Sequence, residues 1–412
     1  MMDRIRILYP FAGDTGLGGS HVSAYGLIAG LNPDRFVPHV LIHRQAGAVG
    51  TYFRDMGLSV EVAPDLPLMR TPNYPREGDI RPAAYFLRLV PRLITEIRRI
   101  GPQIVHTNEG RLHTNWSIPT RLCGRKHLWH HRQDPRAFGI NKLAPVTASR
   151  IVSVSQFALP AKPVRSIEGR YDIVRSPFDF SAPLPDPDHT RRMILTELDL
   201  PADTLLLGWF GTLVERKKPV RFVEAVAEIQ KAMPGRPVHG LLFGGDDEAD
   251  PTQRQQCLDM ARARGIADNI HMMGFRNPVR DYMAGVDFYL VTAINEPFGR
   301  TLIEAMSLGT SVIATAHGGN TEAITDGVNG FLVPAEDPAA FVAPVTMLAA
   351  DPARLRAILD TARSGVLANY GQQVHVRQIS RIYEELAGGR ARRDALTGCS
   401  WGGQSGGPPS AG

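Results

Sequence analysis

The chain has 412 residues, more than one hydrophobic core usually holds, so two domains are expected. A composition of 43% hydrophobic and 21% charged residues is typical of globular proteins and excludes a fibrous or wholly disordered chain. The net charge of +5 comes from dispersed arginines, without a long basic run or interleaved aromatic residues, which argues against a nucleic-acid-binding protein.

Cysteine usage and hydropathy predict a cytoplasmic protein. Cys123, Cys257 and Cys399 are far apart and odd in number, so neither a disulfide framework nor a zinc site is expected. No apolar stretch approaches the roughly 18 residues of a membrane-spanning helix, and the first residues lack the apolar core of a signal peptide. Residues 81–101 form an amphipathic, arginine-bearing pattern. A helix packed on a sheet is the favoured interpretation, and peripheral contact with the inner face of a membrane is the alternative.

The first half of the chain alternates strand-like and helical stretches, the pattern of βαβ units with a parallel sheet. Strands are predicted at 5–11, 36–43, 102–108, 126–132 and 150–155, and helices at 20–31 and 82–100. We expect these elements to form an N-terminal Rossmann-like domain over residues 1–178. The proline-rich, polar residues 179–190 lack either periodicity and predict a linker.

The alternation restarts after the linker and predicts a second doubly wound domain over residues 191–365. Its strands are predicted at 204–214, 238–245, 270–275, 287–293, 311–316 and 330–335, and its helices at 221–233, 253–265, 279–285 and from about 298. Residues 366–387 are expected to be helical. Residues 388–412, rich in glycine, serine and proline, are expected to be disordered.

The stretch "NEPFGRTLIEAMSLGTSV", residues 295–312, combines a strand end, a helix start and two glutamates. Glu296 follows a predicted strand, where open α/β sheets bind ligands. The backbone N–H groups of Phe298, Gly299, Arg300 and Thr301 are expected at the helix start, a favourable site for an anion. Glu304 lies among apolar residues, where a carboxylate is costly without partners. Dipole compensation for the first glutamate and an ion pair for the second are the plain alternatives to a ligand site.

Residues 296–341 resemble the nucleotide-sugar-binding segment of retaining GT-B glycosyltransferases, the family 4 type. This resemblance implies two facing Rossmann-like domains. It implies that Glu296 contacts the donor sugar and that Glu304 holds the ribose hydroxyls of the nucleotide. It further implies that residues 366–387 cross back onto the N-terminal domain, and that neither a metal nor a cofactor is required, the co-substrate being a nucleoside-diphosphate sugar.

Residues 208–226 resemble a second donor-binding stretch of the same family, with Gly211 in the loop after a strand. The resemblance implies that Lys217 neutralises the donor diphosphate, where a fixed cation would stabilise the departing charge. The family usually has an arginine five residues before this lysine, and here that position is Thr212. Arg216 and Arg300 are the two candidates for the second positive charge.

The N-terminal domain offers two further candidate stretches. Gly18 and Gly19 lie in a glycine-rich loop between a strand and a helix, which the resemblance places across the cleft from the donor phosphates. An NAD site is disfavoured because the next predicted strand ends in His43 and Arg44 and not in an acid. His130 and His131 end another strand. The resemblance puts a histidine near the donor sugar, and strand alternation points the two apart, with His131 preferred.

The function expected from the resemblance is transfer of a sugar from a nucleoside-diphosphate sugar to an acceptor hydroxyl, with retention, in the synthesis of a polysaccharide, glycolipid or other glycoconjugate. The acceptor, a glycan, a lipid-linked molecule or a small molecule, is left open, as are the base, the sugar and the oligomeric state. The alternatives are a GT-B nucleotide-sugar epimerase, an NADP-dependent oxidoreductase and a non-catalytic nucleotide-binding subunit. The acids within 246–250 are interpreted as caps of the next helix and not as metal ligands.

Overall fold

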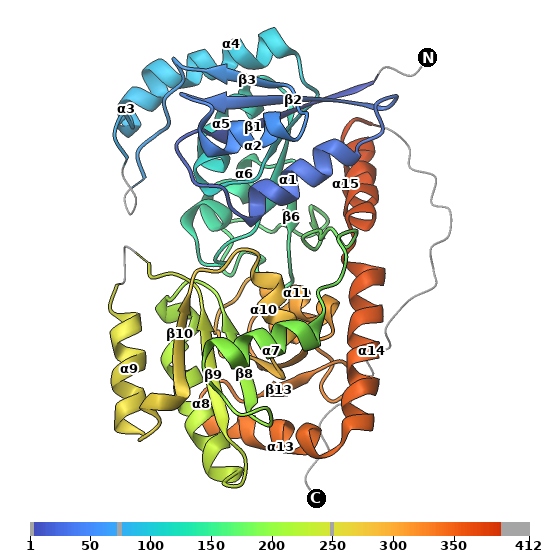
Figure 1. Ribbon diagram of the computed structural model, residues 1–412. Helices are drawn as coiled ribbons and strands as arrows, with labels where there is room; N and C mark the ends of the chain where they lie inside the picture. The colour runs from blue at the N-terminus through green and yellow to red at the C-terminus, as the bar shows by residue number, and fades with distance from the viewer. Residues whose placement is uncertain (1–3, 72–75, 248–250, 389–412) are drawn as a thin grey trace, which may run out of the picture.

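The computed structural model describes residues 4–71, 76–247 and 251–388. It has two lobes, each built from a parallel sheet with helices against it (Figure 1). The predicted class, two Rossmann-like α/β domains facing a central cleft, is confirmed. Nearly all of the tail expected to be disordered, residues 389–412, lies outside the described residues.

The N-terminal lobe contains a seven-stranded parallel sheet in the order β3-β2-β1-β4-β5-β6-β7. Its strands are β1 (Ile5–Ala12), β2 (Phe36–His43), β3 (Val60–Ala63), β4 (Ile104–Thr107), β5 (Lys126–His131), β6 (Arg150–Ser153) and β7 (Tyr171–Ile173). From β1 the chain adds strands toward one edge of the sheet, and from β4 it adds them toward the other edge. The position between β1 and β4 is therefore a topological switch point, and sheets of this kind bind ligands there, outside the carboxyl ends of the strands. The two strands' ends therefore mark where a site is expected.

Helices cover both faces of the first sheet. They are α1 (Gly19–Gly30), α2 (Gly47–Asp55), α3 (Pro82–Ala84), the π-helix η1 (Tyr85–Leu89), α4 (Val90–Ile100), α5 (Gly110–Leu122), the π-helix η2 (Gly139–Leu143) and α6 (Ala144–Thr147). The amphipathic residues 82–100 bury Leu93 and Ile97 in one core cluster with strand residues, as the favoured interpretation predicts. In the described part of the chain, no helix is both long enough and apolar enough to cross a membrane.

The C-terminal lobe contains a six-stranded parallel sheet in the order β10-β9-β8-β11-β12-β13. Its strands are β8 (Leu205–Phe210), β9 (Val238–Phe243), β10 (Ile270–Gly274), β11 (Phe288–Val291), β12 (Ser311–Thr315) and β13 (Phe331–Val333). Both β8 and β11 are buried throughout, as expected of central parallel strands. The switch point of this sheet lies between them, so the carboxyl end of β11 opens toward the cleft.

Helices cover both faces of the second sheet, and the contacts between sheet and helices form two apolar clusters. They are α7 (Pro187–Glu197), the 3-10 turn η3 (Glu215–Lys217), α8 (Pro219–Ala232), α9 (Gln253–Ala263), the 3-10 turn η4 (Ala267–Asn269), α10 (Val279–Gly285), α11 (Arg300–Leu308), α12 (Asn320–Ala323), the 3-10 turn η5 (Pro338–Phe341), α13 (Val342–Ala350), α14 (Pro352–Asn369) and α15 (Gln372–Leu386).

The proline-rich linker is shorter than predicted, because α7 begins inside the range 179–190. The Asp186 carboxylate accepts a hydrogen bond from the His189 N–H at 3.0 Å and caps the helix. Pro187 occupies its first turn, a position that suits the fixed φ of proline. The helix then buries Ile194 in the C-terminal core. Its first four residues therefore belong to the C-terminal lobe.

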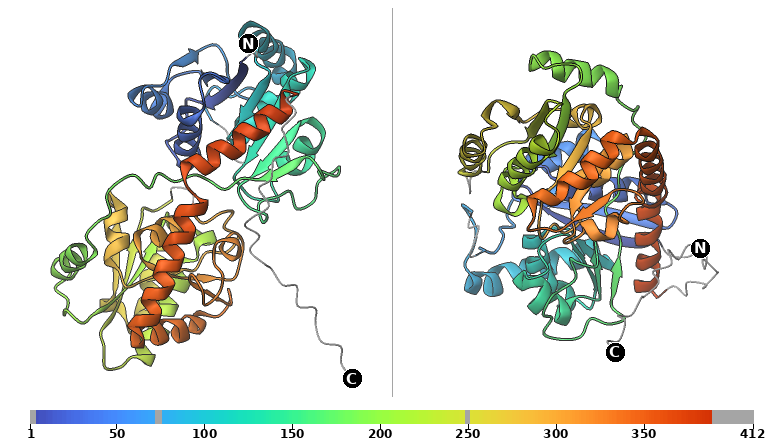
Figure 2. Two further views of the ribbon diagram at one scale, coloured as in Figure 1. Left: turned by 90° about the vertical axis from the view of Figure 1, so that its right-hand side faces the viewer. Right: turned by 90° about the horizontal axis from the view of Figure 1, so that it is seen from below.

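The end of the described chain crosses from one lobe to the other, but later than residue 366. Val366 is still in the C-terminal core, in α14. The chain turns at Tyr370 and Gly371, and α15 then lies on the N-terminal lobe, so that the two helices run along both lobes (Figures 1 and 2). Tyr383 fixes α15 there, because its hydroxyl lies 2.6 Å from that of Tyr9 and also bonds His106 Nδ1.

Removal of one hydroxyl tests this attachment. We expect Tyr383→Phe to lower the free energy of unfolding by about 1–3 kcal/mol, because it leaves Tyr9 and His106 buried without their partner. Tyr25→Phe is the matched control, since the Tyr25 hydroxyl donates to the Met56 carbonyl at 3.2 Å at an exposed position. Urea unfolding of both variants gives the comparison, and equal losses would contradict a special role for Tyr383.

Candidate functional site

A cavity of about 770 Å³ lies between the two lobes and is lined by both. The lining from the N-terminal lobe and the segment after it is Gly19, Ser20, Asn108, Glu109, Arg132, Gln133, Asp134, Arg136, Val154 and Ser176. The lining from the C-terminal lobe is Glu215, Arg216, Lys218 and residues 294–300. Both switch points thus open into one cleft. Of the predicted site residues, it brings together Gly19, Arg216, Glu296, Phe298, Gly299 and Arg300.

Glu296 lies in the loop between β11 and α11. Asn295 has a φ of 55°, a left-handed conformation that asparagine tolerates, and its N–H donates to His317 Nδ1 at 3.0 Å. The Glu296 carboxylate forms an ion pair with Arg216. Its side chain is 17% exposed, whereas that of Arg216 is 43% exposed. The carboxylate is therefore held in place, while its partner extends into solvent.

Helix α11 begins at Arg300, not at Phe298 as predicted. Gly299 is its N-cap with a φ of 78°, which favours glycine, and its carbonyl accepts from the Leu302 N–H at 3.1 Å. Phe298 lies outside the helix and is buried in the C-terminal core, with its ring 6.3 Å from that of Phe178. The free N–H groups of the helix start are those of its first residues, from Arg300 onward.

Arg300 joins the two lobes. Its guanidinium lies over the Phe178 ring at 4.3 Å from the centroid and donates to the Pro177 carbonyl at 3.3 Å and to Ser23 Oγ at 3.2 Å. The absence of a side chain at Gly19 leaves room for it, since a Cβ there would lie 3.0 Å from Arg300 Cδ. One side chain thus connects α11, α1 and residues 174–186 between β7 and α7, which we call the crossover segment.

Glu304 is less enclosed than its apolar neighbours suggest, because 37% of its side chain is exposed. The helix buries the adjacent Ile303 and Ala305 in the core and turns Glu304 toward a separate cavity of about 270 Å³. Its carboxylate lies 3.8 Å from the Arg300 guanidinium. Desolvation raises the pKa of Glu304 above its usual value, although the positive charges of Arg300, Lys217 and Arg280 oppose this shift.

Lys217 lines a small cavity together with Glu296, Gly299 and Thr301. The 3-10 turn η3, which contains Lys217, is held by a hydrogen bond that Thr292 Oγ1 donates to the Lys217 carbonyl at 3.0 Å. A methyl group on Gly211 would overlap the Lys217 ammonium, so the glycine allows its position. Burial lowers the pKa of Lys217, and the nearby Glu296 and Glu304 charges act in the opposite direction. Thr212 lies exposed beside Gly211 and is absent from the lining of the main cavity.

The two candidate histidines are buried at the end of β5, and neither lines the cleft. His130 Nδ1 lies 3.1 Å from His106 Nε2, and its ring stacks against His375 at 5.7 Å between centroids. His131 Nε2 is 3.2 Å from the Asp134 carbonyl. Burial is the first cause that lowers the pKa of both histidines, to about 4 for His131, so both are neutral at pH 7. Arg132, the next residue, is the one that reaches the cavity.

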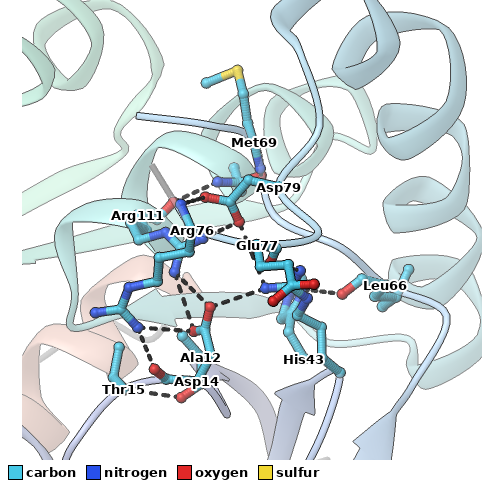
Figure 3. A network of polar contacts seen from close by, with 12 residues as sticks. Ala12, Asp14, Thr15, His43, Leu66, Met69, Arg76, Glu77, Asp79 and Arg111 are labelled. Carbon is cyan, nitrogen blue, oxygen red and sulfur yellow. Dashed lines mark hydrogen bonds and ion pairs between the residues drawn. The ribbon is translucent and has the colours of Figure 1, made fainter. Parts of the chain in front are cut away.

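The glycine-rich loop is fixed by charged contacts at its base. Gly18 caps α1 and donates its N–H to His21 Nδ1 at 3.0 Å, while His21 Nε2 lies 2.9 Å from Glu109. Asp14 is surrounded by arginines, with Arg111 at 2.9 Å (Figure 3). Arg44 lies at 3.0 Å from the same carboxylate. Contacts with Arg111, Arg44 and Glu109 thus hold the two ends of the loop.

Several cleft residues were not identified from the sequence as site residues, notably Asn108, Arg132 and Ser176. Asn108 directly follows β4 at the switch point of the first sheet, so its place at the end of the strand predicted over 102–108 was a usable signal. Ser176 lies in the crossover segment, where no periodicity predicts a contact. Arg132 lies at the end of the strand predicted over 126–132, so the same signal applied to it.

The described residues contain no group of three or more histidine, cysteine, aspartate or glutamate side chains placed to hold a metal ion. Asp246 does not cap α9, whose N-cap is Thr252, and instead pairs with Arg254 at 2.9 Å. Glu248 and Asp250 lie outside the described residues.

Comparison with known structures identifies the fold. The chain is similar to HepE of Anabaena, crystallised with UDP-glucose, with a TM-score of 0.74 and 19% identity over 93% of this chain and 100% of that chain. It is also similar to a glycosyltransferase of Rickettsia africae, with a TM-score of 0.75 and 17% identity over 93% and 99% of the two chains. Two facing parallel-sheet domains around a central cleft define a GT-B fold, and this chain has that fold.

Sequence comparison places the C-terminal domain more narrowly. Residues 204–351 match the model of the family described as glycosyl transferases group 1. The chain is 29% identical over 215 residues to D-inositol 3-phosphate glycosyltransferase of Corynebacterium jeikeium, covering 51% of each. It is 30% identical over 185 residues to the lipopolysaccharide core biosynthesis glycosyltransferase LpsE of Rhizobium meliloti, covering 45% of this chain and 48% of LpsE. The chain thus spans about half the length of the curated relatives that it matches.

The Asp14 network gives a pH-dependent prediction. Burial by itself would raise the pKa of Asp14, but Arg111, Arg76 and Arg44 outweigh burial and hold the pKa below 3.8. Because the folded-state pKa is depressed, the stabilisation is present above about pH 4 and is lost as pH falls through the folded pKa. We expect Asp14→Asn to cost about 2 kcal/mol at pH 7, and the difference from wild type to shrink toward pH 3.

Urea unfolding between pH 3 and pH 7 measures this difference. Asp55→Asn is the matched control, because Asp55 is an exposed residue at the end of α2. Its cost should stay within about 0.5 kcal/mol at every pH. A cost for Asp14→Asn that is the same at pH 3 and pH 7 would show that the carboxylate charge is not what stabilises the loop.

Proposed function

We propose that this protein is a glycosyltransferase that moves a sugar from a nucleoside-diphosphate-sugar donor to an acceptor hydroxyl, with retention at the anomeric carbon. The family of the C-terminal domain supports the reaction class. Proteins named glycosyltransferases among its relatives, and the UDP-glucose complex of HepE, support a nucleotide-sugar donor. The acceptor is a glycan, a lipid-linked molecule or a small molecule, used in the synthesis of a polysaccharide or other glycoconjugate.

One observation carries the proposal: Lys217, Glu296 and Thr301 line the same small cavity, whose residues Glu296 and Gly299 also line the interdomain cleft. A cation, a carboxylate and the start of a helix are thus gathered at the carboxyl ends of β8 and β11. The Lys217 ammonium and the first N–H groups of α11 would bind the diphosphate. As the nucleotide leaves, these groups would stabilise the negative charge that develops on it.

The two glutamates would bind the other parts of the donor, the ribose and the transferred sugar. Glu304 faces its own cavity with a partly exposed carboxylate and would accept hydrogen bonds from the ribose hydroxyls. Glu296 would accept from hydroxyls of the sugar, in exchange for part of its contact with Arg216. The Arg216 side chain is more exposed than that of Glu296. Its guanidinium would then be free to supply the second positive charge, which the family's usual arginine at the position of Thr212 would provide.

Retention would follow from displacement on one face of the sugar. The bond between the anomeric carbon and the diphosphate oxygen breaks, the acceptor oxygen bonds the same carbon, and the leaving phosphate takes the acceptor's proton. The C-terminal domain would hold the nucleotide, and the N-terminal domain most of the acceptor. No metal or cofactor takes part in this proposal, and a histidine of β5 near the sugar stays a prediction.

A ligand screen identifies the donor. UDP, GDP, ADP and dTDP and their sugars would be compared by the shift of the melting temperature, because a ligand that binds only the folded state raises it. We then expect Glu296→Ala to reduce sugar transfer or donor hydrolysis by at least about 100-fold. Glu304→Ala is expected chiefly to raise the donor KM, by about tenfold, because ribose contacts are made before and during the reaction.

Glu336→Ala is the matched control, since its 82% exposed side chain pairs with Arg221 and lies outside the lining of the cleft cavity. Wild-type turnover in Glu296→Ala would overturn the assignment of the site. Conversion of the donor to its sugar epimer without an acceptor would identify an epimerase, and a change of NADPH fluorescence would identify an oxidoreductase. Tight binding of a nucleotide without turnover on any acceptor would indicate a non-catalytic subunit.

A further inference from the structure

The part of the cleft provided by the N-terminal lobe and the crossover segment contains polar groups without partners. We call Ser20, Asn108, Arg132, Gln133 and Ser176 the N-terminal wall. Asn108 is 3% exposed and lines the cavity, yet its amide Nδ2 and Oδ1 both lack a hydrogen-bond partner among the described residues. Buried side-chain amides are normally satisfied, because an unpaired one costs about 1–3 kcal/mol. This amide is therefore available to a molecule in the cleft.

Arg132 adds a positive charge to the same wall. Its Nη1 donates to Ser176 Oγ at 2.7 Å, its Nη2 lies 3.4 Å from His130 Nδ1, and its Nε lacks a partner in the described chain. Within residues 4–71, 76–247 and 251–388, no carboxylate forms an ion pair with it. Burial first, and then the charge of Arg300, lowers the pKa of Arg132 to about 9, so the guanidinium remains charged at pH 7.

The acids near this wall are already engaged. Glu109 lies 2.9 Å from His21 Nε2, and the Asp134 carboxylate accepts from the Arg136 N–H at 2.8 Å. A partly buried, desolvated cation without a counter-ion is costly, and an anion from the cleft would reduce that cost. The cations assigned above to the donor, Lys217 and Arg216, come from the opposite lobe. The unpaired guanidinium therefore faces the half of the cleft that the donor groups leave free.

We propose that the N-terminal wall binds an acceptor that carries an anionic group, with Arg132 holding the phosphate or carboxylate and Asn108 bonding a neighbouring hydroxyl. This inference rests on the proposed glycosyl transfer, because it treats the bound molecule as the acceptor. A guanidinium offers two parallel N–H groups to an anion. An amide both donates and accepts, as a hydroxyl requires. The wall thus matches an acidic sugar or polyol and not a neutral one.

The test measures binding of inorganic phosphate to the full chain saturated with the nucleoside diphosphate that the screen selects. Acetate in a parallel titration distinguishes a carboxylate from a phosphate, and sodium chloride controls for ionic strength. With the nucleotide site filled, we expect phosphate still to raise the melting temperature. Arg132→Gln should weaken phosphate binding by about tenfold or more, the usual effect of a lost charged hydrogen bond. Its effect on nucleotide affinity should stay below about threefold.

Arg136→Gln is the matched control, because it removes one positive charge from the exposed rim of the same cavity. It should change phosphate affinity by less than about twofold. Arg132→Lys keeps the charge and replaces Arg132→Gln in the test if the glutamine variant fails to fold. It should bind phosphate less tightly than wild type, since an ammonium lacks the planar fork.

The results separate this inference from the proposed function. If no nucleotide binds but phosphate binds through Arg132, the donor assignment fails and the anion site stands. The inference is overturned if nucleotide saturation abolishes the effect of phosphate and acetate, or if Arg132→Gln weakens the nucleotide as much as phosphate, because the guanidinium then belongs to the donor site. Equal effects of Arg136→Gln and Arg132→Gln would also overturn it, by showing diffuse attraction only.

Discussion

The cleft depends on how the Arg300 guanidinium is held where the two lobes meet. A cation in the first turn of a helix opposes the helix dipole, so its presence requires compensation. The Phe178 ring at 4.3 Å, the Pro177 carbonyl at 3.3 Å and the Glu304 carboxylate at 3.8 Å supply it. Because the contacts come from α11 and the crossover segment, and Ser23 of α1 adds another, the orientation of the lobes and the floor of the cleft are fixed together.

A second group of contacts supports the same junction. The Glu322 carboxylate accepts from the backbone N–H groups of Gln156 and Phe157 at 2.9 and 2.8 Å, and Ser155 Oγ donates to the Pro297 carbonyl. The bond from Ser155 reaches the loop that carries Glu296, because Pro297 is the next residue. A change in lobe orientation would therefore move the carboxylate proposed to contact the sugar, which gives a physical route from interdomain motion to the site.

The sequence predicted the features that depend on local pattern. Alternating strands and helices predicted two parallel sheets, and the place of Glu296 directly after a predicted strand indicated its position at the cleft. It did not give features set by contacts distant in sequence. Phe298 leaves the helix start because its ring packs against Phe178, and α15 docks through Tyr383 onto Tyr9, 374 residues away. His130 and His131 are covered by packing that a strand pattern does not reveal.

The distribution of similarity along the chain agrees with the proposed assignment of the donor to the C-terminal lobe and of the acceptor to the N-terminal lobe. The family match ends at residue 351 and begins at residue 204, so it covers the lobe that carries Lys217 and Glu296. Asn108 and Arg132 lie outside it, directly after strands β4 and β5 of the other lobe. Groups that bind a common donor must keep their geometry, whereas groups that face a particular acceptor must differ between enzymes. The unpaired guanidinium of Arg132 is thus where this chain would distinguish its acceptor, since its cost is removed only by an anion.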